Sequence, residues 1–257
     1  MDFTSSAEKY DRFMGRYTRT LAPALADAAG IDGGMRVLDV GCGPGGLTEA
    51  LAARVGADNV AAIDPAPQFA AACRERNPGA DVRVGGAEEM PWPDGSFDAT
   101  LASLVLAFMR DADRGVREMA RVTRPGGTVA TCMWDVPGGG MTMLSTFWRA
   151  VRELDPDAVG ERARPGVAEG DIAERFRRAG LEDVVDGSLE ATADYAGFDD
   201  FWEPFTLGVG PAGEYLASQP PDRQARLRET VRAGMPDGAF TLTARAWFAR
   251  GTAPGAA

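Results

Sequence analysis

Residues 37–46 read VLDVGCGPGG, a short apolar run that passes directly into a glycine-rich loop. The apolar run has the composition of a strand buried on both faces. The glycines at 41, 43 and 46 fit the pattern G-x-G-x-x-G, which lets the backbone turn tightly and approach a bound nucleotide cofactor. A helix is expected next, over residues 47–55. This stretch therefore predicts a strand–loop–helix unit that binds a nucleotide.

Strand and helix patterns alternate along the first half of the chain. An amphipathic helix is expected over residues 4–29, with Ser5 and Glu8 as a capping box. Further strands are expected at residues 59–64, 82–84, 97–103 and 128–134, and further helices at 67–76 and 113–123. Alternation at a spacing of about 25 residues predicts an α/β fold with a parallel, doubly wound sheet and right-handed crossovers.

The pattern loosens after residue 135. Helices are expected at 143–154 and 171–179, and two strands at 181–189 and 240–248 with about fifty residues of helical character between them. Two late strands that enclose an insertion indicate a closing hairpin with a helical substrate lobe. We therefore divide the chain into an N-terminal lid helix at 1–34, a cofactor-binding core at 35–135, and a C-terminal part at 136–257 that completes the sheet and carries a capping insertion at about 191–239.

The composition narrows the chemistry. The chain has 257 residues, a formal net charge of −11 and no histidine, which excludes Ser-His-Asp hydrolysis and any His-liganded metal site. We expect no metal. An acidic chain without a basic run is a poor nucleic-acid partner, and no stretch approaches the roughly 20 apolar residues of a membrane span. Three scattered cysteines fit reduced thiols. We expect a cytoplasmic monomer or homodimer.

Two acidic residues accompany the glycine loop. Asp64 ends the second expected strand, 18 residues after Gly46, where a carboxylate can accept both ribose hydroxyls of a nucleoside. These features alone do not separate a nicotinamide dehydrogenase from other nucleoside binders. Asp39 lies inside the first strand, where a dinucleotide-binding strand is usually apolar, and a buried carboxylate needs a partner.

Four stretches together resemble the class I S-adenosylmethionine-dependent methyltransferases, in particular the small-molecule, methyltransferase type 11-like kind. They are residues 37–45, 62–65, 85–98 and 118–128, in the order and spacing of that family. The resemblance covers about residues 35–135. It implies a Rossmann-like, seven-stranded sheet with an antiparallel last strand. The implied activity is transfer of a methyl group from S-adenosylmethionine to a small-molecule acceptor by in-line displacement, with S-adenosylhomocysteine as the product.

The resemblance also implies which residues hold the cofactor. The glycine loop would line the methionine moiety, Asp64 would bind the ribose, and Ala87 and Glu88 would border the adenine. The residues that end the fourth strand would close the pocket. The expected cofactor-binding set is Tyr10, Arg16, Asp39, Gly41, Cys42, Gly43, Gly45, Asp64, Pro65, Ala87, Glu88, Ser103 and Leu104.

Tyr10 and Arg16 enter this set through a hypothesis about the N-terminal helix. Its aromatic face carries more apolar area than a free helix exposes. The helix would fold over the cofactor as a lid, with Tyr10 or Arg16 near the methionine carboxylate. A fixed outer helix on the sheet is the alternative.

The sequence departs from the family at two positions. Gly86 stands where the family often has an aspartate that accepts from the adenine amino group, so Glu88 or a main-chain carbonyl would take that role. Ala107 and Phe108 stand just after the fourth strand, where relatives often carry histidine. The usual candidate for a base near the acceptor is therefore absent.

Aromatic residues are the candidates for acceptor binding. Trp134 ends the fifth strand, where the acceptor should approach the methyl group. Phe198 and Trp202 belong to a set at helical spacing, with Phe201 and Phe205, and either roof the acceptor or pack the lobe. Phe147 is equally undecided. The catalytic residue is unknown, with Asp135 as a candidate. A non-catalytic S-adenosylmethionine-binding protein and an NAD-dependent dehydrogenase are the alternative functions.

Overall fold

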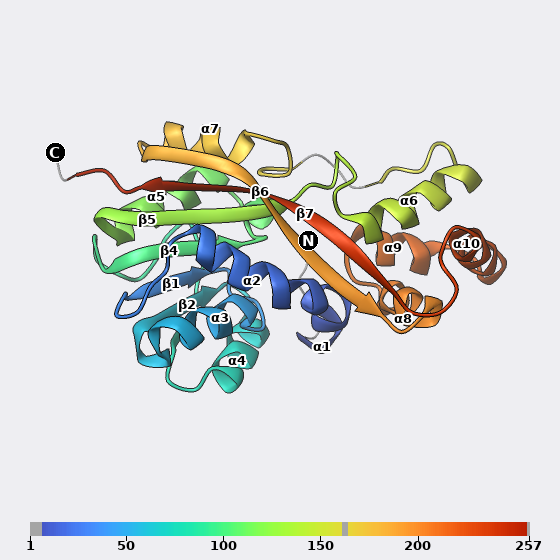
Figure 1. The fold of residues 1–257 in the computed structure, drawn as a ribbon, viewed down its shortest axis with the longest axis horizontal. Coiled ribbons are helices and arrows are strands. Elements are labelled where there is room, and N and C mark those ends of the chain that lie inside the picture. The colour runs from blue at the N-terminus through green and yellow to red at the C-terminus, as the bar shows by residue number, and fades with distance from the viewer. Residues whose placement is uncertain (1–6, 161–163, 256–257) are drawn as a thin grey trace.

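Seven strands form one sheet within residues 7–160 and 164–255, which are the residues that the computed structural model describes. Their order is β3-β2-β1-β4-β5-β7-β6, and β7 runs antiparallel to both of its neighbours while β1 to β5 are parallel. This confirms the predicted doubly wound sheet with an antiparallel last strand (Figure 1). The strands are β1 Val37–Val40, β2 Val60–Asp64, β3 Asp81–Val84, β4 Phe97–Ser103, β5 Thr123–Trp134, β6 Glu182–Tyr195 and β7 Phe240–Thr252.

Helices cover both faces of the sheet. They are α2 Arg16–Ala28, α3 Gly46–Val55, α4 Pro67–Arg76, α5 Ala112–Val122 and α7 Asp171–Arg178. Alternate residues of β1 point to opposite faces, so Val37 packs in a core layer with α2 and α3, and Leu38 packs in a second layer with α5 and α7. This two-sided burial explains why the strand is apolar throughout except for Asp39.

The N-terminal segment is helical but not one uniform helix. It consists of α1 Ala7–Tyr10, a π-helical turn at Asp11–Gly15, and α2. The expected capping residue Ser5 lies outside the described residues. In α2 the apolar positions recur at i, i+4 and i+8, and Tyr17, Leu21 and Leu25 are buried. The predicted amphipathic face therefore packs on the sheet.

The two last strands are longer than the sequence pattern predicted. β6 and β7 continue beyond the rest of the sheet and carry a helical lobe between them (Figure 1). The predicted aromatic helix ends at Trp202 and continues as a 3-10 turn, in which Pro204 has no backbone N–H to continue the α-helical hydrogen bonds. The elements of the lobe are α8 Phe198–Trp202, the 3-10 turn Glu203–Leu207, α9 Gly210–Ser218 and α10 Pro221–Ala233, with α6 Thr142–Leu154 packed beside them.

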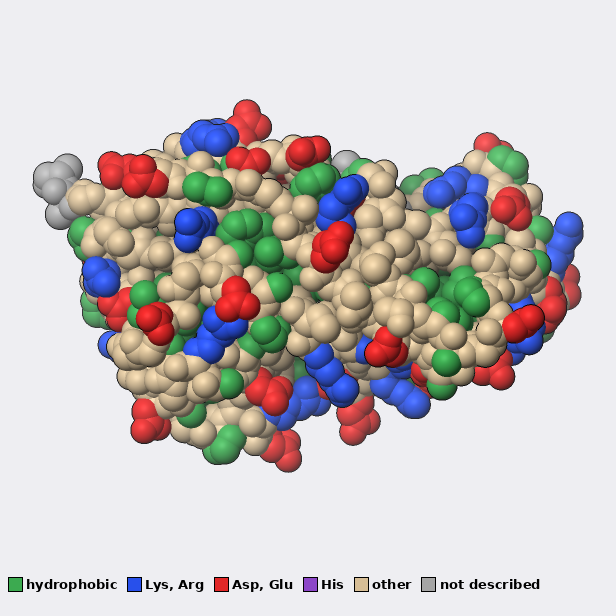
Figure 2. Space-filling model, in the orientation of Figure 1, with side chains coloured by type: hydrophobic (Ala, Val, Ile, Leu, Met, Phe, Trp, Pro, Cys, Tyr) green, Lys and Arg blue, Asp and Glu red, His purple; other side chains and the backbone are tan. Residues whose placement is uncertain are grey.

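The surface carries both signs of charge. Figure 2 shows acidic and basic side chains interspersed over the face drawn, without a continuous basic stripe. Neither sign of charge is concentrated in one patch of this face, although the chain carries a net charge of −11. No helix in the described ranges has the length and apolar character needed to cross a membrane.

Candidate cofactor and acceptor site

The glycine loop joins β1 to α3 and leaves open space at one position. Gly41, Gly43 and Gly45 have φ angles of 70°, 52° and 100°, a region that L-residues rarely adopt. A Cβ atom at Gly41 would lie 2.6 Å from the side chain of Val105, and one at Gly45 would collide with Asn77. A Cβ at Gly43 would meet no atom of the described residues within 4 Å. The loop is thus tightly packed on its inner side and open at Gly43.

Asp64 lies against this loop at the end of β2. Its Oδ2 accepts from the Gly43 N–H at 2.9 Å, and its Oδ1 accepts from the Ala66 N–H at 2.8 Å. A carboxylate offers about four acceptor positions, so two remain for other donors. Burial raises the pKa of Asp64, while these two backbone hydrogen bonds oppose the rise. The structure therefore brings the expected ribose-binding carboxylate to the open glycine.

Asp39 lies beneath the loop with half of its carboxylate unpaired. The side chain is 1% exposed, and its Oδ2 accepts from the Thr48 hydroxyl at 2.6 Å. Its Oδ1 is buried and finds no hydrogen-bond partner among the described residues. Burial raises the pKa of Asp39 to about 7, with the Thr48 hydrogen bond opposing the rise and the nearby Asp64 charge adding to it. A buried anionic oxygen without a donor is costly, and a cationic ligand would relieve that cost.

Cys42 and Pro65 flank these two carboxylates in different ways. Cys42 is buried in a small cluster with Cys73, and the hydrogen bond between the two thiols raises the pKa of Cys42 further than burial alone would. The Cys42 thiol therefore stays protonated, which agrees with a filling role in the loop. Pro65 is exposed and follows Asp64 directly.

The segment after β3 is held in place by hydrogen bonds from the chain that leads into α5. Glu88 Oε1 accepts from the Arg110 N–H at 2.7 Å, and a Cβ at Gly86 would lie 2.9 Å from Glu88 Oε2. The Glu88 carboxylate thus occupies the space beside Gly86, and Ala87 is buried in the α5 layer. The structure therefore places Glu88, the residue expected to take the role of the missing aspartate, beside Gly86.

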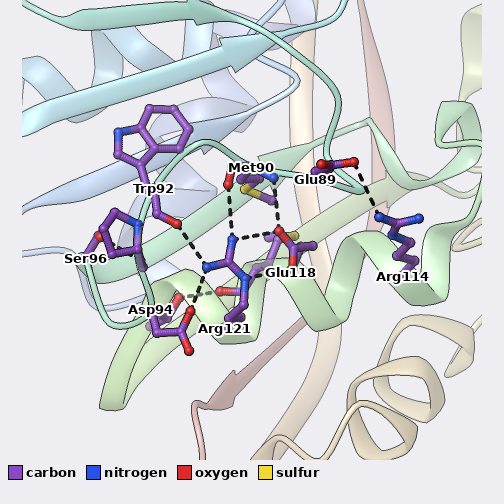
Figure 3. A network of polar contacts seen from close by, with 11 residues as sticks. Glu89, Met90, Trp92, Asp94, Ser96, Arg114, Glu118 and Arg121 are labelled. Carbon is purple, nitrogen blue, oxygen red and sulfur yellow. Dashed lines mark hydrogen bonds and ion pairs between the residues drawn. The ribbon is translucent and has the colours of Figure 1, made fainter.

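Arg121 on α5 fixes the rest of this segment (Figure 3). Its guanidinium donates to the carbonyl oxygens of Met90 and Trp92 at 3.1 and 2.9 Å and to the Asp94 carboxylate at 2.7 Å. It also pairs with Glu118, whose Oε2 accepts from the Met90 N–H at 3.0 Å. The Arg121 hydrogen bond lowers the pKa of Glu118, so this carboxylate stays ionised. Sequence reasoning missed this network because its partners are separated by about thirty residues.

The end of β4 comes close to the glycine loop. Leu104 has a φ of 64° in the left-handed region, and its N–H donates to the carbonyl oxygen of Cys132 at 2.9 Å. Strained residues of this kind cluster at functional sites. Ser103 precedes it, with its hydroxyl 3.7 Å from the Cys132 thiol. Ser103 and Leu104 are thereby fixed at the carboxyl edge of the sheet, one strand from the loop.

Arg16 is engaged with the lobe in this structure. Its guanidinium pairs with Asp200 of the lobe at 2.7 Å, donates to the Asp194 carbonyl oxygen at 2.7 Å and stacks on the Tyr195 ring at 4.5 Å. The side chain is therefore held by the lobe, and its role near the methionine carboxylate stays a prediction. The side chain of Tyr10 lies outside the described part of the structure.

Trp134 ends β5 and Asp135 follows it directly, at the carboxyl edge of the sheet. The Asp135 carboxylate is 2% exposed and pairs with Arg245 at 2.5 Å, while its Oδ1 accepts from the Gly138 N–H at 2.9 Å. These contacts give Asp135 a structural partner on each oxygen. Its assignment as a catalytic base stays a prediction. Trp134 lies beside Tyr17 of α2, with ring centroids 5.9 Å apart.

The candidate lobe aromatics pack against one another. Phe147 stacks on Phe205 at 4.6 Å, and Phe198 stacks on Trp202 at 6.0 Å. All four rings are buried. These contacts favour the packing interpretation of Phe147, Phe198 and Trp202, and their role in acceptor binding stays a prediction. In the described ranges, no group of three or more Cys, Asp or Glu residues is placed to hold a metal ion.

Comparison with known proteins identifies relatives of this chain. A family model described as a methyltransferase domain matches residues 38–131. A demethylmenaquinone methyltransferase of Mycolicibacterium gilvum is 34% identical over 187 residues, which cover 68% of this chain and 77% of that protein. An uncharacterised protein of Mycobacterium tuberculosis is 34% identical over 131 residues, or 49% of this chain and 47% of the relative, so the chain spans about half the length of that relative.

Solved structures share the fold at low sequence identity. A SAM-dependent methyltransferase from Aquifex aeolicus matches with a TM-score of 0.53 at 18% identity, over 73% of this chain and 94% of that one. The sheet order and the flanking helices define a class I S-adenosylmethionine-dependent methyltransferase fold. The chain belongs to this methyltransferase family.

Proposed function

We propose that this chain transfers a methyl group from S-adenosylmethionine to a small-molecule acceptor. The unpaired, buried Oδ1 of Asp39 carries the proposal, because it lies beneath a loop that is open at Gly43. The cofactor has an ammonium group that can donate to such an oxygen. A charge-assisted hydrogen bond of this kind relieves the cost of burying the carboxylate.

The neighbouring residues fit the remaining parts of the cofactor. Asp64 keeps acceptor positions for ribose hydroxyls while two backbone N–H groups hold its carboxylate in place. The segment at residues 85–88 follows the next strand along the sheet, where the base of a nucleoside held at Asp64 would lie. Glu88 offers an acceptor for the adenine amino group beside Gly86.

The chain contributes orientation and exclusion of water to the reaction. The bound cofactor supplies a methyl group on a sulfonium, which is already activated toward attack. Burial raises the pKa of Tyr17, so this phenol stays protonated at neutral pH, and Asp135 is paired with Arg245. An acceptor atom that attacks without losing a proton to the protein, such as a neutral amine, a thiolate or an activated carbon, suits this arrangement.

A small-molecule acceptor is supported by the relatives. The Mycolicibacterium gilvum relative is named for demethylmenaquinone, and the chain covers 77% of it at 34% identity.

Calorimetric titration and a methyl-transfer assay test the proposal. We expect S-adenosylmethionine and S-adenosylhomocysteine to bind with a stoichiometry of one, and NADH not to bind. Radiolabel from the methyl group of the cofactor should then enter a small-molecule fraction of a bacterial extract. Binding without any transfer would support the non-catalytic alternative, and binding of NADH alone would refute the assignment.

A further inference from the structure

The buried hydroxyl of Thr48 links the helix after the glycine loop to the strand before it. Thr48 is the third residue of α3 and is 0% exposed. Its hydroxyl donates to Asp39 Oδ2 on β1 at 2.6 Å, a length typical of a hydroxyl bound to a carboxylate. No other side chain in the described ranges hydrogen-bonds to Asp39, whose Oδ1 is unpaired. Within those ranges, Thr48 is therefore the side-chain donor that supports a charge on Asp39.

A second hydrogen bond fixes the direction of the first. Cys73 of α4 donates its S–H to Thr48 Oγ1 at 3.4 Å. A hydroxyl has one proton to give and two lone pairs with which to accept. Thr48 accepts from Cys73 and gives its own proton to Asp39. This chain of two hydrogen bonds presents a donor to Oδ2, as a charged carboxylate requires.

Three titratable groups face Asp39 from the elements packed around it. They are Asp64 at the end of β2, Cys42 in the loop and Cys73 in α4. Burial raises the pKa of Asp39 to about 7, the Thr48 hydrogen bond opposes the rise, and the Asp64 charge adds to it. A carboxyl group with this pKa changes its charge near neutral pH, so one hydrogen bond decides how much of it is ionised.

The Asp39 carboxylate lies beneath the part of the loop that is open. A Cβ at Gly43 would meet no atom of the described residues within 4 Å. S-adenosylmethionine carries positive charge on its sulfonium and on its ammonium. A buried carboxylate attracts these charges through the protein interior, where the dielectric constant is low, and the attraction does not require contact with the enclosed oxygens. A protonated, neutral Asp39 gives no such attraction.

We propose that Thr48 is a positioning residue of the cofactor site, which keeps Asp39 ionised beneath the glycine loop and thereby sets the pH below which the cofactor binds weakly. The inference rests on the proposed binding of S-adenosylmethionine and names a regulation of that same site by pH. Thr48 is fully buried, so its effect reaches the ligand only through the charge of Asp39.

Three variants separate this role from simple packing. Thr48→Val keeps the shape of the side chain and removes the donor, and Thr48→Ser restores the donor. Thr131→Val is the control, because Thr131 is also 0% exposed and its hydroxyl donates to the Ala102 carbonyl oxygen at 2.7 Å rather than to a carboxylate. Calorimetry with S-adenosylhomocysteine measures affinity from pH 6 to pH 8. The amine of this ligand titrates equally in every comparison, so differences between variants belong to the protein.

Wild type should bind S-adenosylhomocysteine more tightly as the pH rises, because Asp39 loses its proton. We expect Thr48→Val to lower the affinity about 10- to 100-fold at pH 6 and about 2- to 10-fold at pH 8, because a hydrogen bond to a charged group stabilises the ionised form. Thr48→Ser and Thr131→Val should follow the wild-type profile. A loss in Thr48→Val that is equal at every pH would show a packing role and overturn the inference. Absence of binding to wild type at every pH would instead refute the proposed function.

Proton release covers the case in which Thr48→Val does not fold. Calorimetry in two buffers of different ionisation enthalpy counts the protons released when S-adenosylhomocysteine binds. Wild type should release on the order of one proton at pH 6 and fewer at pH 8, because binding favours ionised Asp39. Asp39→Asn should release markedly fewer at pH 6. Equal release by Asp39→Asn and wild type would contradict a role for the ionisation of Asp39.

Discussion

Replacing Asp39 by asparagine should change stability and cofactor affinity in opposite directions. The carboxyl group has a pKa of about 7 in the folded protein because it is completely buried, against about 3.9 in an unfolded chain. Between these values the folded state binds the proton more tightly, so the stabilising contribution of Asp39 is complete below about pH 4 and is lost as the pH rises to about 7.

The size of this effect follows from the two pKa values. Their difference is about three units, and each unit corresponds to about 1.4 kcal/mol, which sets an upper limit of about 4 kcal/mol. The asparagine introduced by the substitution is neutral at every pH, and its amide oxygen can still accept from the Thr48 hydroxyl. The Asp39→Asn variant without cofactor should therefore gain stability relative to wild type as the pH rises from 5 to 8.

Cofactor binding should respond in the other direction. The variant cannot offer an anionic oxygen to the cofactor ammonium, and the loss of a charged hydrogen bond costs about 1.5–3 kcal/mol. We expect S-adenosylmethionine to bind roughly 10- to 150-fold more weakly at pH 8. A residue that only fills space in the core would not combine higher stability with weaker binding.

Urea unfolding at several pH values and calorimetric titration measure the two effects. Asp237→Asn is the control, because Asp237 is exposed in the turn before β7 and should leave both quantities unchanged. A stability difference between Asp39→Asn and wild type that is constant from pH 5 to 8 would refute the buried-charge reasoning. Unaltered S-adenosylmethionine affinity would refute the role of Asp39 in the site.

Three further predictions concern the same edge of the sheet. Asp64→Ala should weaken S-adenosylhomocysteine binding about 10- to 150-fold in calorimetry, since a charged acceptor is lost, and an unchanged affinity would exclude it from the site. Gly41→Ala should lower the melting temperature more than Gly43→Ala, because only the first meets a side chain, whereas Gly43→Ala should weaken cofactor binding; equal melting temperatures would contradict the packing argument. Asp135→Asn should lower the melting temperature, because it breaks an ion pair whose carboxylate is buried, and leave kcat within a few-fold once an acceptor is found; a large loss of kcat alone would identify Asp135 as the base.

Local sequence patterns predicted most of the secondary structure. The strand over residues 97–103 and the helix over residues 67–76 have the predicted bounds, and the glycine loop lies between a strand and a helix as expected. Such patterns can be recognised in the sequence because the spacing of buried residues within a helix or a strand depends only on that element. The strands at 182–195 and 240–252 were predicted too short, because their extra residues are stabilised by pairing with distant strands. The strand at 123–134 was also predicted too short, and of its extra residues Thr123 pairs with Phe97.

The sequence by itself predicted that Asp39, Gly43 and Asp64 lie close together, since the carboxyl ends of neighbouring parallel strands meet at one edge. Only the tertiary structure decided which polar groups find partners. Asp135 pairs with Arg245 across 110 residues, and Arg16 pairs with Asp200 across 184, so neither pairing follows from local spacing. The unpaired Oδ1 of Asp39 has the same origin, because a missing partner becomes visible only once every neighbouring element of the described residues is packed in place.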